Sequence, residues 1–462
     1  MKLSIPATLL ASAFAGTIAR SQSLPNNFPL LDGSGFVETY NLNNAPISLT
    51  GAFFQSLGTN GRSCSSCHLP TESWSVSAAE IQLRFLLTQG TDPIFRTNDG
   101  SNCDHSIDTS TLEGRRSAYS LLTSRGLIRI ALPVPANAQF TVQSVNNPYG
   151  CNETSTVSVY RRPLPATNLR FLSTLMWDGR ESTAPSTVKI AYPNTGQLLA
   201  DLAHQAIDAI TGHAQGAVPA NAQVLDIVNF ETALQTAQAL DFQAGSLSNA
   251  GGNGGPVALA AQAFFIGVND SFPASFGNNP TGAPFNPAIF NLFNSWTNSP
   301  VRQRASIARG EVVFNSKPIT ISGVAGINDV VGLPPSFSGT CGTCHDSPNV
   351  GDHSVSAALN IGVADIDSPL NVSYLPVFTL VNNTTHAVIK TTDPGRALIT
   401  GQWADIGKVK GPVLRGLASR APYFHNGSAA TLSDVIQFYD TRFGIGFTAR
   451  EKADLIAFLN AL

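Results

Sequence analysis

Two stretches of the sequence decide the fold and its chemistry: Cys64-Ser-Ser-Cys67-His68 and Cys341-Gly-Thr-Cys344-His345. In each stretch the Cys-x-x-Cys spacing places two sulfurs on one turn, and a histidine follows directly. This pattern attaches a haem through two thioether bonds and turns the imidazole onto the iron. One such pentapeptide can arise by chance. Two in one chain predict two covalently bound c-type haems.

Zinc and a redox-active dithiol are the alternative interpretations of these cysteines. Zinc modules usually pair their Cys-x-x-Cys units about 15–20 residues apart, whereas these two units stand in different parts of the chain. Nothing near either unit is typical of a thioredoxin-like fold. The adjacent histidine in both motifs favours haem.

A similar lead-in precedes each motif. Gly51-Ala-Phe-Phe comes before the first, and Gly310-Glu-Val-Val-Phe comes before the second. This predicts a mostly α fold of two cytochrome c-like haem domains related by duplication, with long loops and a few short strands. We expect residues 22–300 to form the N-terminal domain and residues 301–462 the C-terminal domain, with the boundary between positions 250 and 305.

Hydrophobic periodicity indicates where the regular elements lie. Apolar residues at three- and four-residue steps predict helices over 198–215 and 224–240. A capping box, Thr448-Ala-Arg-Glu451, predicts a helix at the C-terminal end of the sequence. Short strands are expected over 127–130 and 377–381.

The composition and the N-terminus bear on location. The 462 residues carry a formal net charge of -3, which excludes a basic nucleic-acid footprint. Lys2, the short apolar run 5–19 and the small residues around it are typical of a signal peptide, for which we expect residues 1–21. The protein is therefore expected to be secreted or periplasmic, and no later stretch is apolar enough to span a membrane.

Two cysteines lie outside the haem motifs, Cys103 and Cys151. A disulfide between them suits the oxidising compartment that an export signal implies. Two free buried thiols are the alternative.

A resemblance to a known family rests on two further blocks. Residues 411–432, Gly-Pro-Val-Leu-Arg-Gly-Leu-Ala-Ser-Arg-Ala-Pro-Tyr-Phe-His-Asn-Gly-Ser-Ala-Ala-Thr-Leu, and Met176-Trp-Asp-Gly-Arg180 resemble segments of the dihaem cytochrome c peroxidase superfamily. With the two haem motifs in the same order, the resemblance covers roughly residues 45–462.

The resemblance implies a division of labour between the haems. In that family the N-terminal haem reacts with peroxide, and the C-terminal haem receives electrons from an external donor. A tryptophan lies between them, which assigns the bridging role to Trp177; an ordinary core tryptophan is the alternative. The implied partners are hydrogen peroxide or dioxygen, and a small redox protein or an organic reductant as the electron donor.

The sequence departs from the family in its methionines. Many members ligate the second haem with a methionine fourteen residues beyond the histidine of the Phe-His-Asp-Gly segment. Counting fourteen from His425 reaches Tyr439, and the chain contains only Met1 and Met176. Tyrosine there resembles the dihaem enzyme that matures methylamine dehydrogenase, so we expect Tyr439 to be the sixth ligand of a low-potential haem. A packed aromatic residue is the alternative.

A second departure concerns the acid/base group that peroxide chemistry needs. The peroxidases place a glutamate ten residues beyond a Gln-Ala pair. Here the pair is Gln205-Ala206, and Gln215 stands where the glutamate is expected. His213 can move a proton and continues the apolar face of the predicted helix, whereas His204 falls on roughly the opposite face. A buried, hydrogen-bonded histidine is the alternative for His213.

The sequence also allows other functions. Without the glutamate, the chain is also similar to dioxygen-activating dihaem oxygenases such as the rubber-cleaving enzymes of this superfamily. A pure electron carrier and a haem-binding relic are two further hypotheses.

The peroxidases hold calcium through backbone carbonyls and water, and Pro422 falls in the matching stretch, so calcium stays open. Asp405, Arg415 and Arg420 are candidate partners of the haem propionates.

Overall fold

The computed structural model describes residues 22–105, 107–182, 195–271, 283–354 and 357–462. The predicted signal peptide, residues 1–21, lies outside these ranges. None of the helices within them combines the length and the apolar character needed to cross a bilayer.

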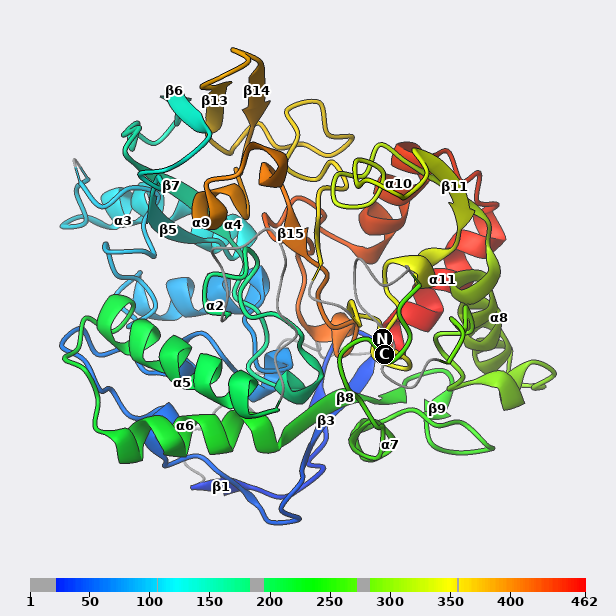
Figure 1. The fold of residues 1–462 in the computed structure, drawn as a ribbon. Helices are drawn as coiled ribbons and strands as arrows, with labels where there is room; N and C mark the ends of the chain where they lie inside the picture. The colour runs from blue at the N-terminus through cyan, green and yellow to red at the C-terminus, as the bar shows by residue number, and fades with distance from the viewer. Residues whose placement is uncertain (1–21, 106, 183–194, 272–282, 355–356) are drawn as a thin grey trace, which may run out of the picture.

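Helices form two groups on opposite sides of the molecule (Figure 1). One side carries α2 (Ala78–Thr88), α3 (Leu112–Ala118), α4 (Ser120–Arg125), α5 (Thr195–Gly212) and α6 (Asn221–Ala233). The other carries α8 (Arg302–Ser316), α10 (Leu432–Phe443) and α11 (Ala449–Asn460). Two shorter helices, α7 (Pro256–Ala260) and α9 (Ala397–Thr400), complete the set within the described ranges.

The helices α8 and α11 cross closely at Gly310. A Cβ atom at this position would lie 2.0 Å from the carbonyl oxygen of Asp454, so only glycine allows the approach. The cap of α11 has the form that the sequence predicts, with Thr448 and Glu451 each accepting the other's backbone N–H. The C-terminal helix of the sequence prediction is thereby confirmed.

Strands are more numerous than the sequence predicts. The largest sheet has the order β2-β3-β8-β9, a second has the order β14-β13-β6, and the others are two-stranded: β1-β4, β5-β7, β10-β11 and β12-β15. Their bounds are β1 Ser23–Leu24, β2 Leu30–Leu31, β3 Gly35–Asn41, β4 Ile47–Ser48, β5 Ile128–Pro133, β6 Phe140–Asn146, β7 Thr156–Arg161, β8 Leu234–Asp241, β9 Gly245–Ser246, β10 Ile319–Ser322, β11 Ser336–Gly339, β12 Ala358–Leu359, β13 Val377–Asn382, β14 Val388–Thr391 and β15 Val409–Lys410. The fold is a mixture of helices, short strands and loops.

The predicted helix over 224–240 is only half correct. Its first part is α6, but the chain turns extended at Leu234, and β8 then pairs antiparallel with all of β3. Five consecutive residues from Leu234 to Gln238 are buried, on both faces of the strand. The partner strand lies almost two hundred residues earlier, and a local periodicity cannot register such a pairing. The helix predicted over 198–215 is confirmed as α5, and the strands predicted near 128 and 377 are confirmed as β5 and β13.

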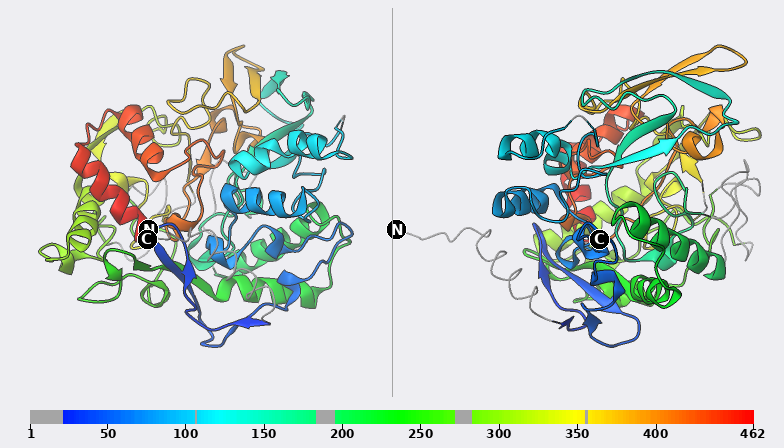
Figure 2. Two further views of the ribbon diagram at one scale, coloured as in Figure 1. Left: turned by 180° about the vertical axis from the view of Figure 1, so that it is seen from behind. Right: turned by 90° about the vertical axis from the view of Figure 1, so that its left-hand side faces the viewer.

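Two large hydrophobic clusters fill the interior. The first packs α5 and α6 against Phe53, Trp74 and Phe171. The second packs α8, α10 and α11 around Phe290 and Phe458. Each contains a cysteine of one haem motif among the residues packed against it, so each motif lies at the edge of its own core. The left view of Figure 2 shows the two helical groups on opposite sides of the loops between them.

Candidate functional site

The two Cys-x-x-Cys-His motifs adopt the same local conformation. Each begins with a single 3-10 turn, Cys64–Ser66 in the first motif and Cys341–Thr343 in the second. The residue before each turn donates its backbone N–H to the hydroxyl of the turn's last residue, at 3.0 Å in the first and 2.9 Å in the second. This closes the turn and brings the two sulfurs of the motif together.

Both motif histidines have one ring nitrogen committed. Nδ1 of His68 lies 2.9 Å from the Trp74 carbonyl oxygen, and Nδ1 of His345 lies 2.6 Å from the Gly351 carbonyl oxygen. A carbonyl can only accept, so Nδ1 carries the proton in each ring and Nε2 keeps its lone pair. A histidine held in this way is preset to ligate a metal through Nε2.

The four motif cysteines form no disulfide and lie in apolar surroundings. Burial raises the pKa of the thiols of Cys341 and Cys344 to about 12, and it raises that of Cys64 and Cys67 as well. Zinc sites need thiolates, which these surroundings disfavour. Neutral sulfurs on one turn beside an apolar cavity instead suit thioether bonds to a haem.

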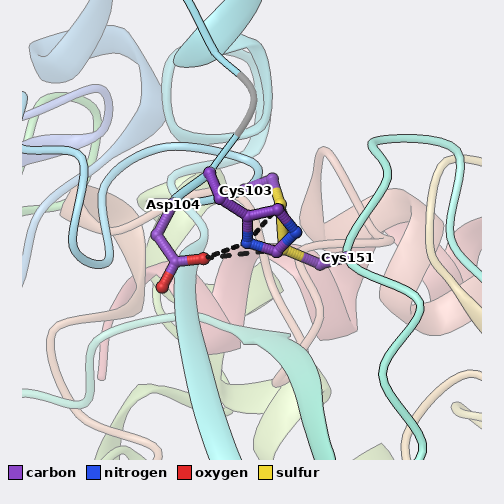
Figure 3. A group of neighbouring side chains, drawn as sticks. Cys103, Asp104 and Cys151 are labelled. Carbon is purple, nitrogen blue, oxygen red and sulfur yellow. Dashed lines mark hydrogen bonds and ion pairs between the residues drawn. A yellow bond between two sulfur atoms is a disulfide. The ribbon is translucent and has the colours of Figure 1, made fainter.

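Cys103 and Cys151 form the predicted disulfide (Figure 3). Asp104 and His105 lie beside it, so the four side chains have the residue types of a metal site. The two sulfurs are bonded to each other, however, and the Asp104 carboxylate forms an ion pair with Arg129 at 2.7 Å. The group is therefore a disulfide cross-link beside charged side chains.

A cavity opens beside each motif. The first cavity contains Cys64, Cys67 and His68, and is lined mainly by α5, α6 and the segment 161–180. The second cavity contains Cys341, Cys344 and His345, and is lined by apolar residues of β10, α10 and α11. Both have the apolar walls that a haem macrocycle requires.

Trp177 lines both cavities. Its indole N–H donates to the carbonyl of Arg162 at 2.8 Å, and its ring centroid lies 6.0 Å from that of His425. The side chain is buried. Its place between the cavities is the one that the bridging role requires, although the role itself stays a prediction.

His213 stands at the first cavity at the end of α5. Its Nδ1 pairs with the Asp99 carboxylate, and the same carboxylate pairs with Arg62, whose Nε donates to the Pro93 carbonyl at 2.9 Å. Burial alone would raise the pKa of Asp99, but the contacts with His213 and Arg62 outweigh it and hold that pKa below its usual value. Asp99 is thus an anion, and its carboxylate fixes the orientation of the His213 ring through Nδ1.

His204 and Gln205, which are neighbours on α5, point in different directions, as helical geometry predicts. Gln205 lines the first cavity. His204 points away, with its side chain 65 % exposed and Nδ1 2.8 Å from Glu181. Gln205 and His213 therefore share the cavity, and His204 does not.

Tyr439 lines the second cavity together with His345. Burial raises the pKa of its phenol, and the neighbouring motif cysteines raise it further. In the protein without a metal the phenol is therefore neutral. Ligation by Tyr439 remains a prediction that this location permits.

Three residues at the cavities were not candidates in the sequence analysis: Asp99, Glu231 and Lys410. Glu231 lines the first cavity, and its Oε2 has no hydrogen-bond partner among the described residues; burial raises its pKa to about 8. A glutamate four residues after Ile227 on the apolar face of α6 is the signal that could have found it. His353 and Lys410 line the second cavity, and only tertiary structure brings them there.

His353 lies close to the second motif histidine: its ring is parallel to that of His345, with the centroids 6.4 Å apart. Burial is the main cause that lowers its pKa to about 3, so it is neutral at any ordinary pH.

The buried cations suit an anionic group near the second cavity. Arg420 lines it and leaves Nε without a partner, and Arg415 leaves Nε and Nη2 without one among the described residues. Haem propionates would satisfy such donors. Asp405 instead accepts from Thr400 at 2.8 Å and from Lys408 at 3.3 Å, and it lines neither cavity. The residues at both cavities fit a haem.

Comparisons with known proteins find cytochrome-c peroxidases that match part of the chain. The cytochrome-c peroxidase IdrP2 of Denitromonas iodatirespirans is 34 % identical over 135 residues, which cover 27 % of this chain and 36 % of that protein. The cytochrome-c peroxidase IdrP1 of Pseudomonas sp. (strain SCT) is 30 % identical over 146 residues, 26 % of this chain and 36 % of that protein. The matches thus span about a third of the length of each relative.

Solved structures overlap more of the chain but loosely. A MauG-like protein associated with microbial copper homeostasis has a TM-score of 0.35 at 16 % identity, covering 88 % of this chain and 85 % of its own. A variant of the diheme peroxidase BthA from Burkholderia thailandensis has a TM-score of 0.30 at 13 % identity, covering 95 % of both. No protein-family model matches the chain. From its motifs and its curated relatives, the chain resembles the dihaem cytochrome c peroxidase superfamily.

Proposed function

We propose that this chain is an exported dihaem c-type oxidoreductase that reduces hydrogen peroxide at the first cavity with electrons passed on from the second. Cys64, Cys67 and His68 would hold the reactive haem. Cys341, Cys344 and His345 would hold the electron-transfer haem. A small redox protein or an organic reductant would supply the electrons.

One observation carries this proposal. Each motif histidine lies at its own apolar cavity with Nδ1 tied to a carbonyl and Nε2 free, and Trp177 borders both cavities. Two such cavities on either side of one indole suit electron transfer from one site to the other.

The first cavity contributes the proton chemistry. A haem bound there would supply the iron at which the peroxide O–O bond is cleaved. Nε2 of His213 accepts the proton from the inner peroxide oxygen and returns it to the outer one, because Asp99 holds the other ring nitrogen as the donor. Gln205 orients the peroxide by hydrogen bonding from the same helix. A pure electron carrier would need no such pair of histidine and carboxylate.

The second cavity contributes electron storage. Tyr439 would bind as a phenolate, a hard anionic donor that favours ferric iron and lowers the reduction potential. Apolar walls exclude water from this side. Calcium remains an open prediction, since backbone carbonyl ligands would leave no mark in the sequence.

The spectrum of the purified protein, recorded with and without peroxide, tests the proposal. A pyridine haemochrome assay should report two c-type haems per chain, and one should be high-spin ferric and respond to peroxide. Two low-spin haems inert to both peroxide and dioxygen would identify a carrier instead. A response to dioxygen in the presence of an organic substrate, but not to peroxide, would identify an oxygenase.

A further inference from the structure

Lys410 lies at the point where the two cavities meet. It belongs to β15, and its backbone N–H donates to the carbonyl of Trp177 at 2.9 Å. Its ammonium donates to the carbonyl of Thr174 at 2.8 Å. Both ends of the residue are therefore fixed to the segment that carries the shared tryptophan.

The ammonium of Lys410 is a buried charge. The residue is 6 % exposed, and its side chain lines the first cavity as well as the second. Burial lowers the pKa of Lys410, and the nearby carboxyl of Asp352, which is 2 % exposed and lines neither cavity, partly offsets that effect. Asp352 and Lys410 are thus two buried groups whose charges interact, and of the two only Lys410 borders the cavities.

Arg162 also lines both cavities, but its hydrogen-bond acceptors differ from those of Lys410. The Arg162 guanidinium donates to the backbone carbonyls of Val76 at 2.6 Å, Arg420 at 3.0 Å and Gly126 at 3.2 Å. These carbonyl dipoles screen its charge and give it a structural task. Among the described residues, the Thr174 carbonyl is the one neutral acceptor of the Lys410 ammonium, so this charge is screened less than that of Arg162.

We propose that the buried ammonium of Lys410 is an electrostatic positioning group common to both haem sites, which raises the reduction potential of each and keeps the two potentials linked. The proposal rests on the proposed pair of haems. An electron arriving at either site is stabilised by the same cation, because Lys410 borders both cavities and its charge acts through a low-dielectric interior. Lys410 itself takes part in no bond-making step.

Spectroelectrochemical titration of the two-haem protein tests this proposal. In Lys410→Met both midpoint potentials should fall, each by about tenfold in the equilibrium constant for reduction, or about 59 mV for one electron. Lys410→Arg should keep both potentials near those of the wild type. Lys390→Met, which removes an exposed lysine of β14, should move neither.

Asp352→Asn gives the opposite sign and protects the test against misfolding. Removing the anion leaves the cation unopposed, so both potentials should rise. Potentials unchanged in Lys410→Met, a shift at one haem alone, or a fall in Asp352→Asn would overturn the proposal. A haemochrome assay showing fewer than two haems in the wild type would instead overturn the proposed function, which keeps the two failures distinct.

Discussion

The two cavities differ most in their acids. Asp99 and Glu231 line the first, whereas no aspartate or glutamate is found among the described residues that line the second. The first cavity also has His213 at its rim, with 44 % of that side chain exposed, while Tyr439 in the second is half-buried. Carboxyl groups that can hold or pass protons thus line the first cavity and not the second, among the residues that the structure describes. The difference teaches that two motifs with the same local fold can be given separate tasks by the helices around them.

Removing the thioether cysteines tests whether the motifs are equivalent anchors. Cys64→Ser with Cys67→Ser should leave one covalent haem, and so should Cys341→Ser with Cys344→Ser, because each pair serves its own cavity. Intact-mass measurement and the haemochrome assay would count the haems. As a control, Cys103→Ser with Cys151→Ser should keep two. A chain that still carries two covalent haems after either motif is changed would contradict the assignment.

His213→Gln tests whether proton transfer belongs to the first cavity. The rate of reaction with peroxide should fall by about 10²–10⁴-fold, the usual contribution of a general acid–base group. The spectrum of the second haem should not change. Stopped-flow absorbance would measure the rate, and His204→Gln, on the exposed face of the same helix, is the matched control. Equal rates in both variants would refute the role of His213.

Tyr439→Phe tests the second cavity. Loss of the phenolate should change the spectrum of the second haem and raise its reduction potential, while the first haem keeps its spectrum. Tyr423→Phe is the control, since Tyr423 lines the same cavity but donates its hydroxyl to the Leu417 carbonyl at 2.9 Å. If the two variants have the same spectra as the wild type, Tyr439 is a packed aromatic residue.

Glu231→Gln tests the difference in acidic residues between the two cavities, and its expected effect is smaller than those of the variants above. Burial raises the pKa of Glu231 to about 8 from an unfolded value of 4.5, so the folded state keeps a proton that the unfolded state releases. Its contribution to stability is present below pH 4.5 and is lost as pH rises towards 8. The free energy of unfolding of the wild type should fall relative to the variant by up to about 1.4 kcal/mol per pH unit in that window.

Chemical denaturation at several pH values would measure this difference. Glu113→Gln, whose side chain is 85 % exposed, should show no such dependence. Parallel pH profiles of the wild type and Glu231→Gln would mean that the carboxyl is solvated.

Local features were predictable from the sequence and non-local ones were not. The two haem motifs and the Thr448–Glu451 cap depend on residues three or four positions apart, so their spacing predicts them. The strand β8 was mistaken for helix because its partner is β3. Asp99 and Lys410 become site residues only through folding, since segments distant in sequence bring them to the cavities. The domain boundary near 250–305 stays a prediction.

The sheet β14-β13-β6 has a practical consequence. In it β6, from residues 140–146, pairs along its whole length with β13, from residues 377–382. A protease cut in a connecting loop would therefore yield two pieces that remain joined, as a nicked protein that elutes at the size of the whole. Half-length fragments made separately would each expose an unpaired strand edge and tend to aggregate. The two haem motifs can be mutated one at a time, but they are better studied in one chain than in two.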